Sequence, residues 1–258
     1  MSERHAIRGS LQPRCGYLSS RALVLFLLAF LGAAGSAAAP IRNVIVCIGD
    51  GMGPGQLEAA RCYAGTNLFF EGFPCQGRMT TWSAGGNVTD SAAAATAMAT
   101  GRKVNNGVIS LAIPGDASEL ETLLEFFRKQ EKSSGLVTTS YLTDATPAAF
   151  GAHASSRSDF AQIAADYLGL TRPDVLLGGG GSGLDAATVA AAGYTVVTDR
   201  ESLAALNVAR HPRVCGLFGN GYLPFEYDGL GMLPGLPAMT AKALEVLSQD
   251  PDGYFFHG

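Results

Sequence analysis

From Asn43 onward, short apolar runs alternate along the chain with segments whose apolar residues recur at helical spacing. The run Asn43–Ile48 is continuously apolar and ends in a glycine-rich turn, which is the pattern of a parallel strand buried on both faces. Segment 118–132 instead carries its leucines and Phe127 on one helical face. The two periods together predict a chain built from alternating strands and helices.

The expected strands are 43–48, 76–82, 135–141, 174–177, 194–197, 212–219 and 253–256. The expected helices are 56–63, 91–100, 118–132, 158–168, 185–192 and 237–247. This alternation predicts an α/β fold, a three-layer α/β/α sandwich with a mostly parallel central sheet. Ligands of such sheets bind outside the carboxyl ends of the strands, and Asp50 and Asp144 both follow an expected strand.

The 258 residues are 47% hydrophobic and 16% charged, which is enough apolar material for one sizeable domain. We assign this domain to residues 40–258. The preceding segment has Arg4, Arg8, Arg14 and Arg21, an apolar run over 22–34 and small residues over 35–39. These three parts are typical of a secretory signal peptide, which we place at 1–38, with cleavage near Ala37 or Ala38. The apolar run is too short and too diluted to favour a stable membrane anchor, so we expect an exported protein, periplasmic or extracellular.

Removing the four arginines and Glu3 from 18 basic and 22 acidic residues leaves 14 and 21, a net charge of −7. No basic stripe interleaved with aromatic residues remains, so the sequence argues against a nucleic-acid partner. An acidic protein that handles anions needs positive charge at its site, from arginine or from metal ions.

Four cysteines follow the expected signal peptide, and none of them forms a CxxC pair. Cys47 lies in a strand expected to be buried, where it serves as a small hydrophobe. Export permits a disulfide between Cys62 and Cys75, and the sequence leaves that pairing open.

The segment Thr89–Arg102 contains the first candidate for chemistry. Asp90 or Ser91 is a natural N-cap, the alanine-rich stretch predicts a helix to about Thr100, and Gly101 ends it. Ser91 then stands at the positive end of a helix, which suits a phosphate group or a nucleophilic role. By local pattern alone, a capped helix packed on a sheet is the commoner use of such a serine.

Two carboxylates follow expected strands, and each has an ordinary alternative role. Asp50 lies between glycines, where it suits a metal ion or a simple Asp-Gly turn. Asp144 and Thr146 can offer a carboxylate and a hydroxyl to magnesium, or Asp144 can cap a short helix that begins at Pro147.

Two cationic or titratable side chains follow. Arg157 can clamp a phosphate with its planar guanidinium, or it can be a solvated surface charge. His153 is better explained as a hydrogen-bonded packing residue than as a metal ligand.

Taken together, these segments resemble the alkaline phosphatase family in order and rough spacing. The resemblance is carried by Ile48–Gly53, Thr89–Ala97, Gly101–Ser110, and Asp144–Phe150 with His153 and Arg157 after it. It extends from about Asn43 to Phe256.

The resemblance implies hydrolysis of small phosphate monoesters through a phosphoserine on Ser91, with two zinc ions and one magnesium ion. It implies that Asp50 and Ser91 contact metal, that Asp144 and Thr146 are magnesium ligands, and that Arg157 holds the substrate's phosphoryl oxygens. A zinc ion would then replace the missing general base by lowering the pKa of the serine. A homodimer stays open.

Family members continue into a Glu-Gly-Gly-x-Ile-Asp motif and further zinc ligands, whereas this sequence reads Phe256-His257-Gly258. None of His153, His211 and His257 stands at a family zinc position. We therefore expect a truncated member with little or no activity. The alternatives are a non-catalytic phosphate-binding or decayed fragment, or a related phosphodiesterase or sulfatase. The sulfatase pattern of x-Pro-x-Arg after the nucleophile is not found after Ser91.

Overall fold

A computed structural model describes residues 41–258. The expected signal peptide, 1–38, and the first residue of the expected domain lie outside this part. Within the described part, no helix is both long enough and apolar enough to cross a membrane.

The described chain is organised around a six-stranded sheet whose paired strands are all parallel, in the order β1-β6-β2-β3-β5-β4. The strands are β1 (Val44–Val46), β2 (Ser133–Tyr141), β3 (Val175–Gly180), β4 (Thr195–Val197), β5 (Val214–Asn220) and β6 (Tyr254–His257). The α/β architecture with a parallel sheet is therefore confirmed.

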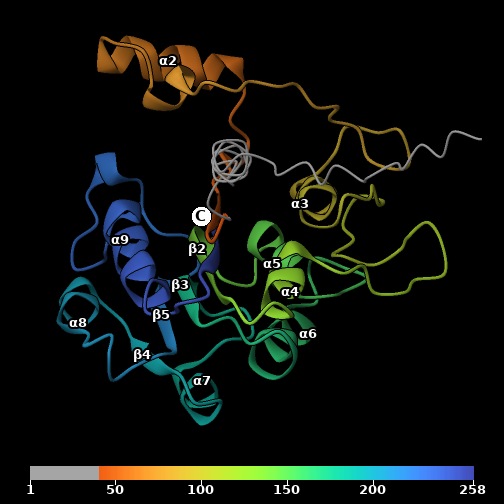
Figure 1. The fold of residues 1–258 in the computed structure, drawn as a ribbon. Coiled ribbons are helices and arrows are strands. Elements are labelled where there is room, and N and C mark those ends of the chain that lie inside the picture. Colours follow the sequence, from red (N-terminus) through yellow and green to blue (C-terminus); the bar gives the residue numbers. More distant parts are fainter. Residues whose placement is uncertain (1–40) are drawn as a thin grey trace, which may run out of the picture. The chain divides into compact units, whose positions relative to one another are not determined.

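The helices are α2 (Pro54–Ala64), α3 (Ser91–Thr100), α4 (Leu123–Arg128), α5 (Ala145–Gly151), α6 (Phe160–Ala165), α7 (Ala186–Ala191), α8 (Arg200–Ala205) and α9 (Leu236–Leu247). Three shorter turns are η1 (Phe69–Gly72), η2 (Asp166–Leu170, a π-helix) and η3 (Glu226–Asp228). Figure 1 shows α8 and α9 on one side of the strands and α4, α5 and α6 on the other.

The two faces of the sheet follow from the period-2 alternation of its strands. Leu136, Leu176 and Phe255 point into one apolar cluster, which α3 to α7 cover. Their neighbours Val137 and Phe256 point into a second cluster, which α8 and α9 cover. Both faces are buried, which gives the three layers predicted from the sequence.

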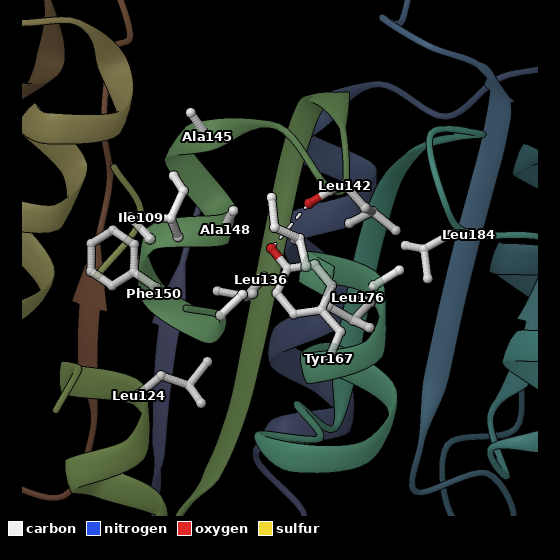
Figure 2. Close-up of a cluster of buried hydrophobic side chains, with 14 of the residues drawn as sticks. Ile109, Leu124, Leu136, Leu142, Ala145, Ala148, Phe150, Tyr167, Leu176 and Leu184 are labelled. Carbon is white, nitrogen blue, oxygen red and sulfur yellow. Dashed lines mark hydrogen bonds between the residues drawn. The ribbon is translucent and has the colours of Figure 1, made fainter. Parts of the chain in front are cut away.

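Figure 2 shows the first cluster, to which α5 contributes Phe150, the loop and helix before β2 contribute Ile109 and Leu124, and the sheet contributes Leu136 and Leu176. Tyr167 is fully buried there, and its hydroxyl donates a hydrogen bond of 3.0 Å to the carbonyl of Leu142. The bond satisfies the one polar atom of a large apolar side chain and so removes the cost of burying it.

Most expected elements appear within a few residues of their predicted bounds, and two predictions are wrong. Segment 76–82 is not a strand, because its residues are exposed and only Trp82 forms an isolated bridge, to Val88. The expected helix 118–132 is helical only over α4, since residues 118–120 pair with the loop before them: Ala112 donates to Ser118 and Leu120 to Ser110. Helix α8 was not predicted.

Strand β1 also differs from its prediction. It lies at an edge of the sheet and pairs only with β6, so it is not buried on both faces. Ile45 keeps 49% of its surface exposed and Cys47 is exposed, which corrects the expectation of a buried thiol. A continuous apolar run cannot distinguish a central strand from an edge strand, because the difference lies in the neighbours that the fold supplies.

Candidate active site

The candidate residues meet at the carboxyl ends of β1, β2 and β6. A cavity of about 480 Å³ opens there, and its lining includes Asp50, Ser91, Asp144, Thr146 and Arg157. These side chains come from four separate stretches of the chain. The crossover connections of a parallel sheet bring such stretches to one edge, as expected for a ligand site in this architecture.

Asp50 connects two of these stretches. Its Oδ1 accepts a hydrogen bond of 3.1 Å from the hydroxyl of Ser91, and its Oδ2 accepts one of 2.7 Å from the hydroxyl of Thr146. The turn that presents it contains Gly51 at φ 68°, a left-handed conformation that glycine adopts without strain. The carboxylate itself is exposed to the cavity.

Ser91 is the first residue of α3, as predicted. Asp90 caps this helix by accepting a bond of 2.9 Å from the amide of Ala93, and Gly101 ends it at φ 71°. Ala92, Ala95 and Ala99 are buried in the first cluster, so the helix is held firmly in place. The serine hydroxyl therefore stands where the helix dipole favours an anion.

Asp144 caps α5, which begins at Ala145 and not at Pro147 as expected. Its Oδ1 accepts from the Ala145 amide at 2.8 Å and from Arg157 Nη2 at 3.0 Å, and its Oδ2 accepts from Ser140 Oγ at 2.5 Å. The cap is thus one of several interactions made by this carboxylate, which is 9% exposed.

Arg157 is half-buried between two carboxylates and is not a solvated surface charge. Its Nη2 lies 3.0 Å from Asp144 and its Nη1 lies 3.4 Å from Asp90. Burial alone would lower the pKa of Arg157, but Asp144 and then Asp90 outweigh it and raise the pKa above its usual value. The backbone amide of Arg157 also donates to the carbonyl of Gly107 at 2.7 Å.

Two neighbours of the site, Ser140 and Tyr222, and a second role of Asp90 do not follow from the sequence. Asp90 was expected as a cap, but its second oxygen also binds the Gly107 amide at 3.0 Å and Arg157. Ser140 and Tyr222 both donate to Asp144, the tyrosine at 3.5 Å. Tyr222 is 78 positions away from Asp144 in the chain, so no local pattern links them.

His153 lies behind the cavity as a packing residue, as predicted, with both ring nitrogens in hydrogen bonds. Cys62 and Cys75 are exposed and unbonded to one another, so the disulfide left open by the sequence is not formed in this structure.

The donor set can be compared with what the metals prefer. Asp50, Thr146 and Asp144 offer carboxylate and hydroxyl oxygens, the ligand type that magnesium prefers. Zinc sites hold about four ligands, usually with histidine or cysteine among them. Within residues 41–258, no group of three or more His, Cys, Asp or Glu side chains is placed to hold a metal ion. The described residues therefore fit part of a magnesium site and do not by themselves make a zinc site.

The model of the alkaline phosphatase family matches residues 41–257, which is most of the chain. The chain belongs to the alkaline phosphatase family. Alkaline phosphatase 3 of Bacillus subtilis is 41% identical over 236 residues, a match that covers 83% of this chain and 50% of the relative. Streptomycin-6-phosphate phosphatase of Streptomyces griseus is 40% identical over 239 residues, covering 78% and 52%.

Solved alkaline phosphatases have the same fold. The enzyme of Thermus thermophilus matches with a TM-score of 0.73 and 32% identity, over 84% of this chain and 49% of that one. A histidine-to-aspartate variant of the enzyme of the Antarctic bacterium TAB5, solved with magnesium in its M3 site, matches at 0.68 and 29%, over 84% and 63%. The present chain spans about half the length of the curated alkaline phosphatase relatives that it matches.

Proposed function

We propose that this site belongs to a phosphomonoesterase that hydrolyses small phosphate esters through a phosphoserine on Ser91. The observation that carries the proposal is the meeting of the Ser91 hydroxyl, at a helix N-terminus, with Asp50 and Arg157 in one cavity. Family membership supports the reaction class, and the residue roles are those that the family resemblance implies, with the geometry of the cavity in support.

The chemistry assigned to the chain's own residues is a two-step displacement. Ser91 Oγ attacks phosphorus, the ester alcohol leaves, and water later breaks the Ser91–phosphate bond to release inorganic phosphate. Asp50 accepts the hydrogen bond of the serine hydroxyl and so fixes its lone pairs toward the cavity. Arg157 presents two N–H groups in a planar fork that matches two phosphoryl oxygens.

Asp90 and Asp144 hold the guanidinium of Arg157 in one orientation before phosphate arrives, at distances of 3.4 and 3.0 Å. A preorganised clamp loses less side-chain entropy on binding than a free surface arginine would lose. The α3 N-terminus adds a favourable dipole for the phosphoryl charge.

The family resemblance implies one magnesium and two zinc ions. Asp50, Thr146 and Asp144 are the residues that would hold the magnesium ion, and bound metal would supply charge stabilisation to the oxygens of the displacement. Beside Asp50 and Ser91 the cavity lining includes His257, but within residues 41–258 no group of three or more His, Cys, Asp or Glu side chains is placed to hold a metal ion, so no step is derived through zinc. The name of the Streptomyces griseus relative points to one phosphomonoester as its substrate, which supports the same ester class here.

The N-terminal pattern over 1–38 leads us to assign the protein to the periplasm or the extracellular space. A homodimer is compatible with this assignment. The second candidate function is phosphate binding without turnover, for which the Arg157 guanidinium and the Ser91 hydroxyl already line one cavity.

The test is hydrolysis of p-nitrophenyl phosphate at alkaline pH, with zinc and magnesium added, by the protein and by its Ser91→Ala variant. The matched control is Ser156→Ala, which removes an exposed hydroxyl outside the cavity lining. Turnover that is lost only in Ser91→Ala supports the proposal. Binding of inorganic phosphate without turnover supports the second candidate, and a folded protein with neither activity overturns both.

A further inference from the structure

The hydrogen bonds of His153 indicate how Arg157, the proposed phosphate clamp, is held in place. The ring is almost fully buried, with 3% of its side chain exposed, and it lies between the loop before α4 and the segment that ends in Arg157. Its Nδ1 lies 2.9 Å from the carbonyl oxygen of Ser110, and its Nε2 lies 3.2 Å from Glu125 Oε1.

The chemistry of these two partners fixes the protons. A carbonyl oxygen can only accept, so Nδ1 must carry a hydrogen. With that hydrogen in place, a neutral ring would direct the bare lone pair of Nε2 at a carboxylate, an unfavourable arrangement inside a protein. A second proton between Nε2 and Glu125 turns this contact into a charge-assisted hydrogen bond. The buried His153 and the half-buried Glu125 therefore share one proton more than the two separated groups would hold at neutral pH.

The pair of His153 and Glu125 lies beside the backbone hydrogen bonds that hold Arg157 in place. Ile109 and Ala154 exchange two backbone hydrogen bonds of 2.9 Å, directly beside Ser110 and His153. Two residues before Ile109, the Gly107 carbonyl accepts the Arg157 amide, and the Gly107 amide donates to Asp90. The Nδ1 bond of His153 to Ser110 thus joins segments 107–110 and 153–157, and the spacing of these two segments sets the position of the Arg157 guanidinium.

Ser110, whose carbonyl binds His153, depends on its hydrogen-bonding partners to keep its backbone conformation. It has φ 43°, a left-handed conformation that is strained for a residue other than glycine. The surrounding bonds hold it there: its amide donates to Thr96 Oγ1 at 3.0 Å and its hydroxyl to the Ala149 carbonyl at 2.6 Å. Its carbonyl accepts from both His153 and the Leu120 amide.

We propose that His153, through its proton-sharing pair with Glu125, is a positioning residue that holds the phosphate clamp Arg157 in register with the nucleophile helix. The inference rests on the proposed function for the role of Arg157, and it adds a residue that touches neither substrate nor metal. When the shared proton leaves, the ring loses its bond to Glu125 and is held only by its Nδ1 bond to the Ser110 carbonyl, so the contact between 107–110 and 153–157 is less firmly fixed.

The charged groups around the ring agree with this assignment. Burial would lower the pKa of His153, but the bonds to Glu125 and to the Ser110 carbonyl, with charge from Glu125 and Glu119, raise it above 6.5. Burial would raise the pKa of Glu125, but His153 and the Thr122 amide lower it below 4.5. The remaining carboxylate beside the ring's own backbone is Asp166, which accepts the His153 amide at 2.8 Å.

The experiment uses Glu125→Ala, Glu125→Gln and the control Glu121→Ala, which removes an exposed carboxylate paired with Lys129 on the same stretch of chain. Two quantities are measured from pH 6 to pH 9: the hydrogen-exchange rate of the Arg157 amide, and the affinity for inorganic phosphate by titration. Each affinity is divided by the wild-type value at the same pH, so the ionisation of phosphate itself cancels.

For Glu125→Ala we expect the Arg157 amide to exchange about tenfold faster and phosphate to bind about tenfold more weakly at pH 6, with the difference from wild type shrinking at higher pH. Glu125→Gln can still bond the ring through its amide, so it should rescue the affinity while removing the pH dependence. Where turnover is measurable, KM should rise more than kcat.

A general loss of stability would not produce rescue by glutamine together with a lost pH dependence. Unchanged exchange and affinity in Glu125→Ala, or equal effects in Glu121→Ala, would overturn the positioning role. Wild-type protein that does not bind phosphate would overturn the proposed function instead, and the exchange rate of the Arg157 amide would still decide this inference.

Discussion

Helices α2 and α3 have almost the same length, 11 and 10 residues, yet only one of them belongs to the core. Helix α3 buries Ala92, Ala93, Ala95, Thr96 and Ala99, whereas α2 buries no residue. The difference extends to the segments around them. Within residues 42–88 Ser83 is the one buried residue, while residues 89–258 contain all of the buried apolar clusters.

Local interactions hold α2 together. Pro54 starts the helix, Gly65 ends it at φ 66°, and Arg61 forms ion pairs with Glu58 and Glu71 at 2.8 and 2.5 Å. Ion pairs near the surface contribute little to stability, far less than burial contributes to α3.

The candidate site is made from both regions. Asp50 belongs to the exposed one, and Ser91, Thr146, Asp144 and Arg157 belong to the packed one. Two hydrogen bonds from Asp50, to Ser91 and to Thr146, join the regions within the cavity. Ser91 and Arg157 are therefore positioned by a packed core, whereas Asp50 is positioned by the glycine turn that follows the edge strand β1, which pairs with β6.

The largest expected effect is the difference in unfolding free energy between alanine variants of one phenylalanine from each region. Phe150 is fully buried in the first cluster, so Phe150→Ala should lower the free energy of unfolding by about 3–5 kcal/mol. Phe69 is 91% exposed, so Phe69→Ala should change it by about 0.5 kcal/mol or less. Denaturant unfolding of both variants measures the contrast. A large cost for Phe69→Ala would mean that residues 42–88 are packed in solution and that the contrast is wrong.

The second prediction compares matched alanine amides in the two helices. Ala95 and Ala99 lie in a helix packed on the core, and Ala59 and Ala60 lie in a helix with no buried residue. Opening of α2 needs no loss of core packing, so its amides should exchange at least about a hundredfold faster than those of α3. Hydrogen exchange followed by NMR gives the four rates. Equal protection in both helices would contradict the division into two regions.

The sequence predicts both α2 and α3 correctly, but it does not show which of the two helices is buried. The alanine-rich block with Asp90 before it and Gly101 after it identifies α3 through caps and propensity, which are local properties. Whether a helix is covered depends on segments far away in the chain, such as α5, which packs beside α3. The same limit explains β1, whose apolar run looks central although the fold leaves it at an edge.

The candidate site shows the same division between local and distant information. Strand-end carboxylates and a capping serine are visible in the sequence because their positions relative to strands and helices are local. Tyr222 and Ser140, which bind Asp144, become apparent only when the crossover connections bring β2, β5 and their loops together. The second role of Asp90, as a partner of Arg157, was hidden behind its role as a cap.

The smallest expected effect is a difference in how the stability contributed by one ion pair of each region depends on pH. The pKa of His153 is raised in the folded protein, so its contribution to stability is complete below 6.5 and is lost as pH rises through the folded value. The pKa of Glu71, the half-buried partner of Arg61, is lowered by the arginine's hydrogen bond. Its contribution is present above 4.5 and is lost only as pH falls through the folded value.

Between pH 5 and pH 9 the two pairs should therefore behave differently. The gap in unfolding free energy between wild type and Glu125→Gln should shrink as pH rises, by about 1 kcal/mol, the size of one hydrogen bond. The gap between wild type and Glu71→Gln should stay flat over the same range, because both charges of that pair persist. Denaturant unfolding at several pH values measures both gaps. A flat profile for Glu125→Gln would show that the buried pair holds no shared proton, and the packed region would then lack a pH-sensitive contact at the clamp.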